Sequence, residues 1–230
     1  MFDLCALLRE NPYPGRGIVL GRSLDGKRAV MVYFIMGRSE NSRNRVFEET
    51  ADGIRTRAFD EGKMTDPSLI LYHPVRVVEG TTLVTNGDQT DTIADALRSG
   101  RSFAQALRTR TFEPDGPNWT PRISGAMGPG GGYRLSILKN GGGGCQRFFF
   151  EYDAPVPGTG HFISTYETDG DPLPSFRGEP RPVALGDESA RALADRIWDA
   201  LSAANKVSLF VRTAELPAGK TDTVLINKHG

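Results

Sequence analysis

The stretch GIVLGRSLDGKRAVMVYFIMGR, residues 17–38, contains a strong signal for the architecture of this protein. It contains two runs rich in β-branched and aromatic residues, 17–23 and 27–38, which are joined by Asp25 and Gly26. Asp-Gly between two such runs is a strong signal of a β-hairpin. The sequence therefore predicts that the sheet of this protein begins with an antiparallel hairpin.

Further strands and helices follow along the chain. Residues 68–80 and 81–86 predict a second strand pair, with Pro74 at an edge, a bulge or a strand end. A third hairpin is expected over 133–140 and 145–153, and single strands are expected over 161–168 and 206–213. Residues 38–49 are rich in arginine and polar residues, which predicts a loop.

Three helices are expected between and after these strands. Asp88 or Thr90 can cap a helix that stops near Gly100, because Ile93, Ala94 and Leu97 follow in a helical pattern. Residues 102–105 contain a capping box for a second short helix, and Asp187 can cap a third over 188–205. Antiparallel hairpins with helices among them indicate an α+β chain in one domain, residues 1–230.

Composition excludes several classes of protein. Lys plus Arg equals Asp plus Glu at 28 each, so no bulk charge favours nucleic acid or an anionic membrane. The two cysteines, Cys5 and Cys145, have no paired spacing, which argues against a zinc site and a disulfide framework and suits a reducing cytoplasm. The first fifteen residues make a poor signal peptide, and no run of about 20 apolar residues predicts a membrane span.

The simplest catalytic motifs are absent from the sequence. There is no phosphate-binding GxxxxGK[ST], no GxGxxG that opens a helix after a strand, no HExxH and no GxSxG. The three histidines are scattered, so a shared metal site or a histidine general base has little support. The glycine runs 128–132 and 141–144 are best read as loop and hairpin connections.

Arginines at strand ends and in loops are more informative. Taken singly, each is a solvated surface charge; taken together, they can converge on one anion, since guanidinium presents a planar donor fork that suits phosphate. These arginines are Arg22, Arg38, Arg43, Arg45 and Arg122. Spacing alone does not decide between the two interpretations.

The turn in TNGDQTDTIADAL, residues 85–97, also allows two interpretations. One is a tight turn with a helix N-cap. The other is a polar floor for a ligand, in which the helix N-terminus offers free N–H groups and Asn86 offers both a donor and an acceptor.

These stretches, in this order, resemble the archaeal-type inosine monophosphate (IMP) cyclohydrolase family. The resemblance runs through residues 15–39, the Asn44-Arg45 pair, residues 82–97, NWTPRISG at 118–125 and FISTYE at 162–167. The loop from Arg38 to Arg45 is longer than the family's usual spacing, which leaves open whether Arg43 or Arg45 holds the family's position.

The resemblance implies a fold like the N-terminal nucleophile hydrolases, a four-layer αββα sandwich of two antiparallel sheets. It also implies ring closure of 5-formamidoimidazole-4-carboxamide ribotide to IMP, without a cofactor or metal, by a homo-oligomer. Its implied catalytic residues are Arg122, Tyr33 and Tyr72. Its implied substrate-binding residues are Arg22, Arg38, Ser39, Arg43, Arg45, Asn86, Gly87, Asp88, Thr120, Tyr166 and Glu167.

Two other functions are compatible with the sequence. A self-processing amidohydrolase of the same fold would expose Cys5 as its first residue, although Cys5 lies in an apolar run that predicts burial. A purine nucleotide-binding protein without turnover would use the same polar residues to bind its ligand.

Overall fold

The predicted hairpin forms the middle of a six-stranded antiparallel sheet. In the computed structural model, which describes residues 1–64, 67, 69–217 and 219–229, β1 (Arg16–Arg22) pairs with β2 (Arg28–Met36). Gly26 in the turn has a φ of 72°, which glycine adopts at no steric cost. The sheet has the order β11-β10-β1-β2-β12-β13 and also contains β10 (Thr159–Ser164), β11 (Arg181–Ala184), β12 (Lys206–Glu215) and β13 (Thr221–Asn227).

A second antiparallel sheet has seven strands in sequence order, β3 to β9. Its strands are β3 (Arg45–Thr50), β4 (Gly53–Ala58), β5 (Val75–Val78), β6 (Thr81–Thr85), β7 (Arg122–Met127), β8 (Tyr133–Asn140) and β9 (Cys145–Tyr152). The hairpin predicted over 133–153 is therefore confirmed. Of the strand predicted over 68–80, only the part after Pro74 pairs as a strand.

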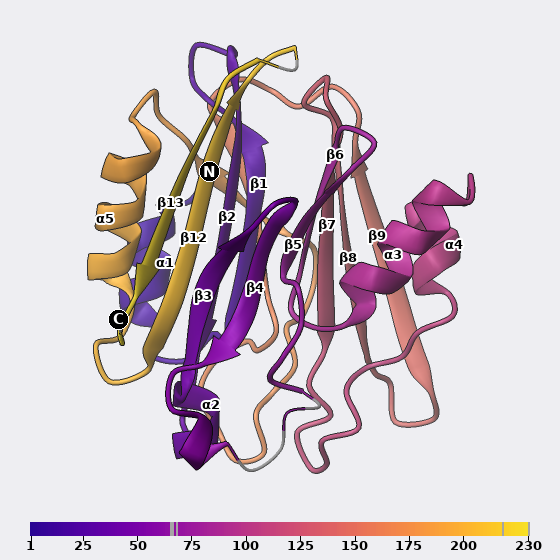
Figure 1. Cartoon of the computed structure of the whole chain (residues 1–230), viewed down its shortest axis with the longest axis vertical. Helices are drawn as coiled ribbons and strands as arrows, with labels where there is room; N and C mark the ends of the chain where they lie inside the picture. Colours follow the sequence, from indigo (N-terminus) through magenta and orange to yellow (C-terminus); the bar gives the residue numbers. More distant parts are fainter. Residues whose placement is uncertain (65–66, 68, 218, 230) are drawn as a thin grey trace.

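Helices lie on both outer faces of the pair of sheets (Figure 1). On the six-stranded sheet these are α1 (Leu4–Glu10) and α5 (Ala190–Ala200), and on the seven-stranded sheet they are α3 (Gln89–Arg98) and α4 (Phe103–Leu107). The short α2 (Glu40–Arg43) precedes β3, and a 3-10 turn, η1 (Glu61–Lys63), follows β4. The α+β prediction, with two antiparallel sheets, is confirmed.

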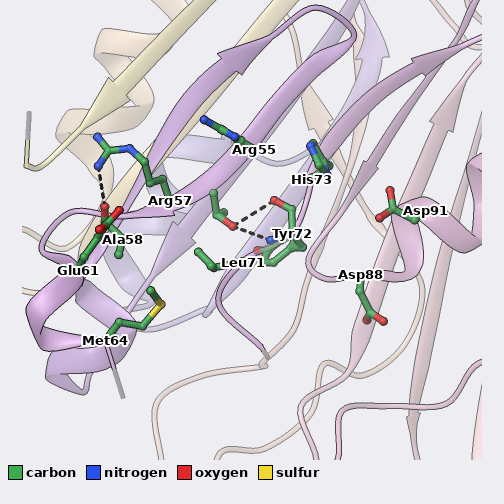
Figure 2. Close-up of a pocket in the computed structure, with 11 residues that line it drawn as sticks. Arg55, Arg57, Ala58, Glu61, Met64, Leu71, Tyr72, His73, Asp88 and Asp91 are labelled. Atoms are coloured by element: carbon green, nitrogen blue, oxygen red, sulfur yellow. Dashed lines mark hydrogen bonds between the residues drawn. The ribbon is translucent and has the colours of Figure 1, made fainter. Parts of the chain in front are cut away.

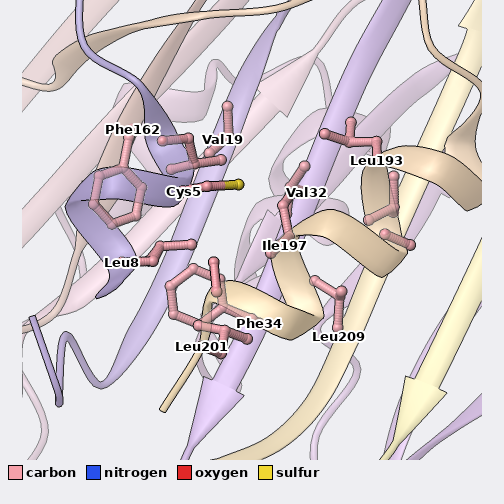
Figure 3. Packing of buried hydrophobic residues seen from close by; sticks show 14 of the residues in the cluster. Cys5, Leu8, Val19, Val32, Phe34, Phe162, Leu193, Ile197, Leu201 and Leu209 are labelled. Atoms are coloured by element: carbon pink, nitrogen blue, oxygen red, sulfur yellow. The ribbon is translucent and has the colours of Figure 1, made fainter. Parts of the chain in front are cut away.

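Three apolar layers hold these elements together. One lies between α1, α5 and the six-stranded sheet, where Cys5, Leu8 and Ile197 pack onto Val32 and Phe34 (Figure 3). A second fills the space between the two sheets, and a third lies under α3 and α4. Burial of aliphatic and aromatic side chains at about 25 cal/mol per Å² is the dominant favourable term in such a fold.

The local helix signals have mixed outcomes. The capping box of Ser102 and Gln105 is present, and α3 is followed by Gly100 at φ 73°. The prediction that Asp187 caps the last helix is wrong. The Ser189 side chain caps α5 by accepting a hydrogen bond from the backbone N–H of Ala192, whereas Asp187 accepts one from the backbone N–H of Asp25. The loop predicted over 38–49 is also wrong in part, because it contains α2 and most of β3.

None of the helices within the described residues is both long enough and apolar enough to cross a membrane.

Candidate active site

Two arginines form the centre of the site, Arg45, which is buried, and Arg16, which is partly buried. Arg45, the first residue of β3, is 0% exposed, and Arg16 begins β1. The Nε of Arg45 donates to the carbonyl of Ser42 at 2.9 Å, but its Nη1 and Nη2, and the Nε of Arg16, find no hydrogen-bond partner among the described residues. A buried charge without partners costs several kcal/mol, so these donors indicate a binding site for an anionic or oxygen-rich ligand.

Two tyrosines border the arginine pair. The hydroxyls of Tyr33, from β2, and Tyr72 share a hydrogen bond of 2.8 Å. The hydroxyl of Thr56 positions Tyr72, because it accepts from the backbone N–H of Tyr72 and lies within donating distance of its carbonyl. Burial raises the pKa of both phenols, although the charges of Arg16 and Arg45 oppose the rise. Both hydroxyls therefore stay protonated at neutral pH; one donates to the other, and the second keeps its proton for a ligand.

Glu113 supplies a carboxyl group to the same site. The residues whose charged or polar groups interact here form one cluster: Arg16, Arg45, Tyr33, Tyr72, Glu113 and Arg122. Glu113 is 3% exposed, and burial raises its pKa to about 7 despite the nearby charges of Arg16 and Arg122. The backbone N–H of Glu113 donates to the carbonyl of Thr120 at 2.9 Å, which fixes the loop that carries it. A carboxyl with a pKa near neutrality can both give and accept a proton, as general acid-base catalysis requires.

The turn before α3 orients Arg122 and does not cap the helix through Asp88. Asp88 makes no side-chain cap bond; its carboxylate lies 2.8 Å from Nη1 of Arg122 and 2.5 Å from Nη2 of Arg110. Burial opposes ionisation of Asp88, but the hydrogen bond from Arg110 and the charge of Arg122 hold its pKa below the ordinary value. The Oε1 of Gln89 also accepts a hydrogen bond of 2.7 Å from Nη1 of Arg122.

Asn86 is fully engaged within the protein. Its Nδ2 donates to the carbonyl of Pro121 at 2.9 Å and, more weakly, to Glu113 Oε1 at 3.4 Å. Its Oδ1 accepts from the backbone N–H of Ile123 at 2.8 Å and from Gln89 at 3.0 Å. Asn86 therefore positions the start of β7 and the Glu113 carboxyl, and its polar atoms are occupied without a ligand.

A pocket of about 510 Å³ adjoins this cluster (Figure 2). Arg55 and Arg57 of β4 line one side, and His73 and Asp91 line another. Tyr72 and Asp88 connect the pocket with the cluster, since they also contact Tyr33 and Arg122 respectively. A volume of 300–1,000 Å³ is typical of small-ligand sites, so the pocket has room for a mononucleotide.

The sequence-predicted residues divide into two groups. The structure brings a first group together in one connected region: Tyr33, Tyr72, Arg45, Asn86, Gly87, Asp88, Thr120, Arg122 and Tyr166. Arg38 lies at its rim, paired with Asp169 and 5.1 Å above the ring of Tyr13.

The structure does not bring the other predicted residues into the cluster. Arg22 lies at the opposite end of β1 from Arg16, roughly 20 Å along the strand, where it donates to the carbonyl of Gly26. Arg43 turns away to Gly37 and Asn205, so Arg45 is the arginine of this pair that enters the cluster. Ser39 caps α2, and Glu167 pairs with Arg181.

Sequence reasoning missed Arg16, Glu113 and Tyr13. Arg16 directly precedes the first predicted strand, and Glu113 lies in a proline-punctuated loop, FEPDGP, where no periodicity singles it out. Their proximity arises from the packing of β1 against the loop before β7, which no local signal predicts. Within the described part of the chain, no three His, Cys, Asp or Glu side chains are grouped to hold a metal ion.

Known proteins are similar to this chain over most of its length. A family model described as "IMP cyclohydrolase-like protein" matches residues 13–219. A protein of Methanopyrus kandleri named IMP cyclohydrolase is 33% identical over 181 residues, which are 71% of this chain and 89% of that protein. One of Methanosphaera stadtmanae with the same name is 31% identical over 67% of this chain and 74% of its own length. The chain thus belongs to the family of IMP cyclohydrolase-like proteins.

Proposed function

We propose that this protein is an IMP cyclohydrolase, an enzyme of purine biosynthesis that closes the ring of 5-formamidoimidazole-4-carboxamide ribotide to give IMP and water. The observation that carries the proposal is the unpartnered, buried guanidinium nitrogens of Arg16 and Arg45 beside the Glu113 carboxyl, whose pKa is about 7. The relatives named IMP cyclohydrolase support the same activity.

Ring closure needs orientation and proton transfer more than a nucleophile from the protein. The carboxamide nitrogen of the substrate attacks the carbon of its own formyl group and loses a proton, while the formyl oxygen gains one. The former formamide nitrogen then loses its proton as the hydroxyl leaves as water. Holding two reacting groups of one molecule in position can lower the barrier by several kcal/mol.

The geometry suggests how the substrate lies. Arg45 has two unpartnered donors at the end of its guanidinium, which suit two phosphate oxygens. Glu113 feels the charges of Arg16 and Arg122 more strongly than that of Arg45. We therefore place the phosphate at Arg45 and the formyl group beside Glu113.

Each residue near the formyl group then has a chemical task. The neutral Glu113 carboxyl gives the formyl oxygen its proton, and the resulting carboxylate takes the proton of the former formamide nitrogen. Arg122 and Tyr72 donate hydrogen bonds to the oxygen as charge develops on it; such donors are worth about 3–4 kcal/mol each in other enzymes.

A finer fold assignment belongs to this proposal. Helices on both outer faces of two antiparallel sheets support the αββα architecture of the N-terminal nucleophile hydrolases. Cys5 does not support the self-processing chemistry of many such enzymes, because it is buried under α5 beside Arg196 and burial raises the pKa of its thiol. An intact mass without loss of the first four residues is the expected result.

Assembly and location are two further parts of the proposal. β9 is an edge strand with Phe148 41% exposed, a surface on which a second copy can pair, so we expect a homo-oligomer in light scattering. Cys5 and Cys145 are free thiols, as a reducing compartment would leave them, and we expect the protein in the cytoplasmic fraction of its cell.

The experiment is an absorbance assay of the purified protein with the formamido ribotide, with calorimetry of IMP binding beside it. Turnover by the wild type is expected. Arg45→Met should weaken substrate binding at least tenfold, whereas the control Arg22→Met, at the far end of β1, should retain wild-type rates. Binding of IMP without turnover would identify a nucleotide-binding protein and refute the enzyme.

A further inference from the structure

Three side chains form a continuous hydrogen-bonded chain from the cluster to the surface. The hydroxyl of Tyr166 lies 2.5 Å from the hydroxyl of Thr120, which in turn contacts Oδ2 of Asp115. Tyr166 and Thr120 are buried, at 2% and 0% exposure, whereas Asp115 is partly exposed. At its inner end, Tyr166 is a close neighbour of the charged Arg16.

The chemistry of these groups fixes the direction of the hydrogen bonds. A carboxylate only accepts, so the single proton of the Thr120 hydroxyl is donated to Asp115. Thr120 must then accept from Tyr166, whose own proton points away from the cluster. The lone pairs of the Tyr166 oxygen consequently remain free to accept a hydrogen bond from a ligand beside Arg16.

The loop that carries this chain is firmly held. The backbone N–H of Thr120 donates to Oδ1 of Asp115 at 2.7 Å, and the carbonyl of Thr120 accepts from Glu113. On the other side, the ring of Tyr166 stacks on Tyr13 with centroids 5.9 Å apart. Gly15 leaves room for this ring, since a Cβ there would come within 2.5 Å of it.

We propose that Tyr166, Thr120 and Asp115 form a proton relay that accepts the carboxamide proton during ring closure and returns it to the departing hydroxyl. The inference rests on the proposed function. Tyr166 is the catalytic residue of the relay, and Thr120 and Asp115 are positioning residues that act through it.

The proton count of the reaction closes with this relay. As the carboxamide nitrogen attacks, its proton passes to the Tyr166 oxygen, the proton of Tyr166 passes to Thr120, and that of Thr120 passes to Asp115. The reverse sequence later gives one proton to the leaving hydroxyl. Glu113 supplies the other proton of the water and recovers one from the former formamide nitrogen, so both groups end as they began.

The test compares kcat and KM of four variants with the formamido ribotide. Thr120→Val keeps the shape of the side chain but breaks the chain of hydroxyls. Asp115→Asn reverses it, because the amide N–H donates to Thr120, which then donates to Tyr166. Both should lower kcat about tenfold or more, with KM changed less than threefold.

The remaining two variants are controls. Thr120→Ser restores a hydroxyl and should recover most of kcat, whereas Thr213→Val, at a buried threonine of β12 outside the cluster, should turn over like the wild type. Melting temperatures show which variants fold. If Thr120→Val does not fold, the relay is tested by the kcat of Asp115→Asn, which should fall, against that of Thr120→Ser, which should stay close to the wild type.

Two outcomes would overturn the relay alone: wild-type kcat in both Thr120→Val and Asp115→Asn, or a loss confined to KM. An inactive wild type would instead refute the proposed function, and the role of the relay in it.

Discussion

Glu113 shows how burial turns an ordinary side chain into an acid-base group. Its carboxyl is buried away from water, and the surrounding arginines offset only part of the cost of ionisation. The result is a pKa of about 7 in a residue whose ordinary pKa is 4.5. The folded protein therefore binds this proton more tightly than the unfolded chain does.

This difference predicts a pH dependence of stability. As pH rises from about 4.5 to 7, the unfolded chain loses the proton while the folded protein keeps it, so the free energy of unfolding falls, by on the order of 3 kcal/mol. Glu113→Gln has no carboxyl to titrate at this position, so its free energy of unfolding lacks this dependence on pH. Urea denaturation at pH 5 and pH 8 should show the variant gaining stability relative to the wild type at the higher pH. An equal difference at both values would contradict the raised pKa.

Gly87 allows Arg122 to approach the turn before α3. A Cβ at this position would lie 2.5 Å from Nη1 of Arg122 and 2.7 Å from Oε1 of Gln89. Both are ends of flexible side chains, so Gly87→Ala should fold with a melting temperature close to the wild type while it displaces Arg122. We expect kcat to fall about tenfold or more. Unchanged kcat in the folded variant would remove Arg122 from the reaction.

At the scale of elements, the start of α3 shows a conflict between helix capping and the site. Asp88 is at the N-cap position but makes no cap bond, because its carboxylate is engaged by Arg110 and Arg122. Of the two interpretations of TNGDQTDTIADAL, the helix cap by Asp88 is therefore wrong. Asp88 instead orients an arginine of the candidate site, and helix α3 begins without a cap from the Asp88 side chain.

Asp88→Asn tests this division of roles. A capping Asp would cost about 1 kcal/mol on replacement by a residue that cannot cap, but Asn caps equally well, so any effect reports the lost charge. We expect little change in the urea midpoint and a several-fold loss of kcat/KM, since Arg122 loses its ion pair. A variant with full kcat/KM would show that the ion pair does not support catalysis.

Elements predicted from the sequence share a local cause. The hairpin of β1 and β2 follows from an Asp-Gly turn between two β-rich runs, and the start of α4 from its capping box. β3 and β13 were missed because charged and polar residues interrupt their patterns: β3 reads RVFEET and β13 reads TDTVLIN. Their strand structure depends on pairing with β4 and β12, which are tertiary partners.

At the scale of the whole molecule, the site depends on which ends of strands meet. Arg16 and Arg22 are six residues apart on β1 and lie at opposite ends of the strand, so only one of them can reach the cluster. Sequence reasoning chose Arg22 because it ends a predicted strand just before the hairpin turn. The stacking of the two sheets, which decides the outcome, has no signature in either segment.

We propose above all that Arg16, Arg45 and Glu113 together bind the purine ribotide. A crystal structure of the protein with IMP would test this binding mode. The phosphate should lie against Nη1 and Nη2 of Arg45, and the ring carbon that came from the formyl group should lie beside Glu113. IMP bound elsewhere, with Arg16 and Arg45 still without a partner, would contradict it.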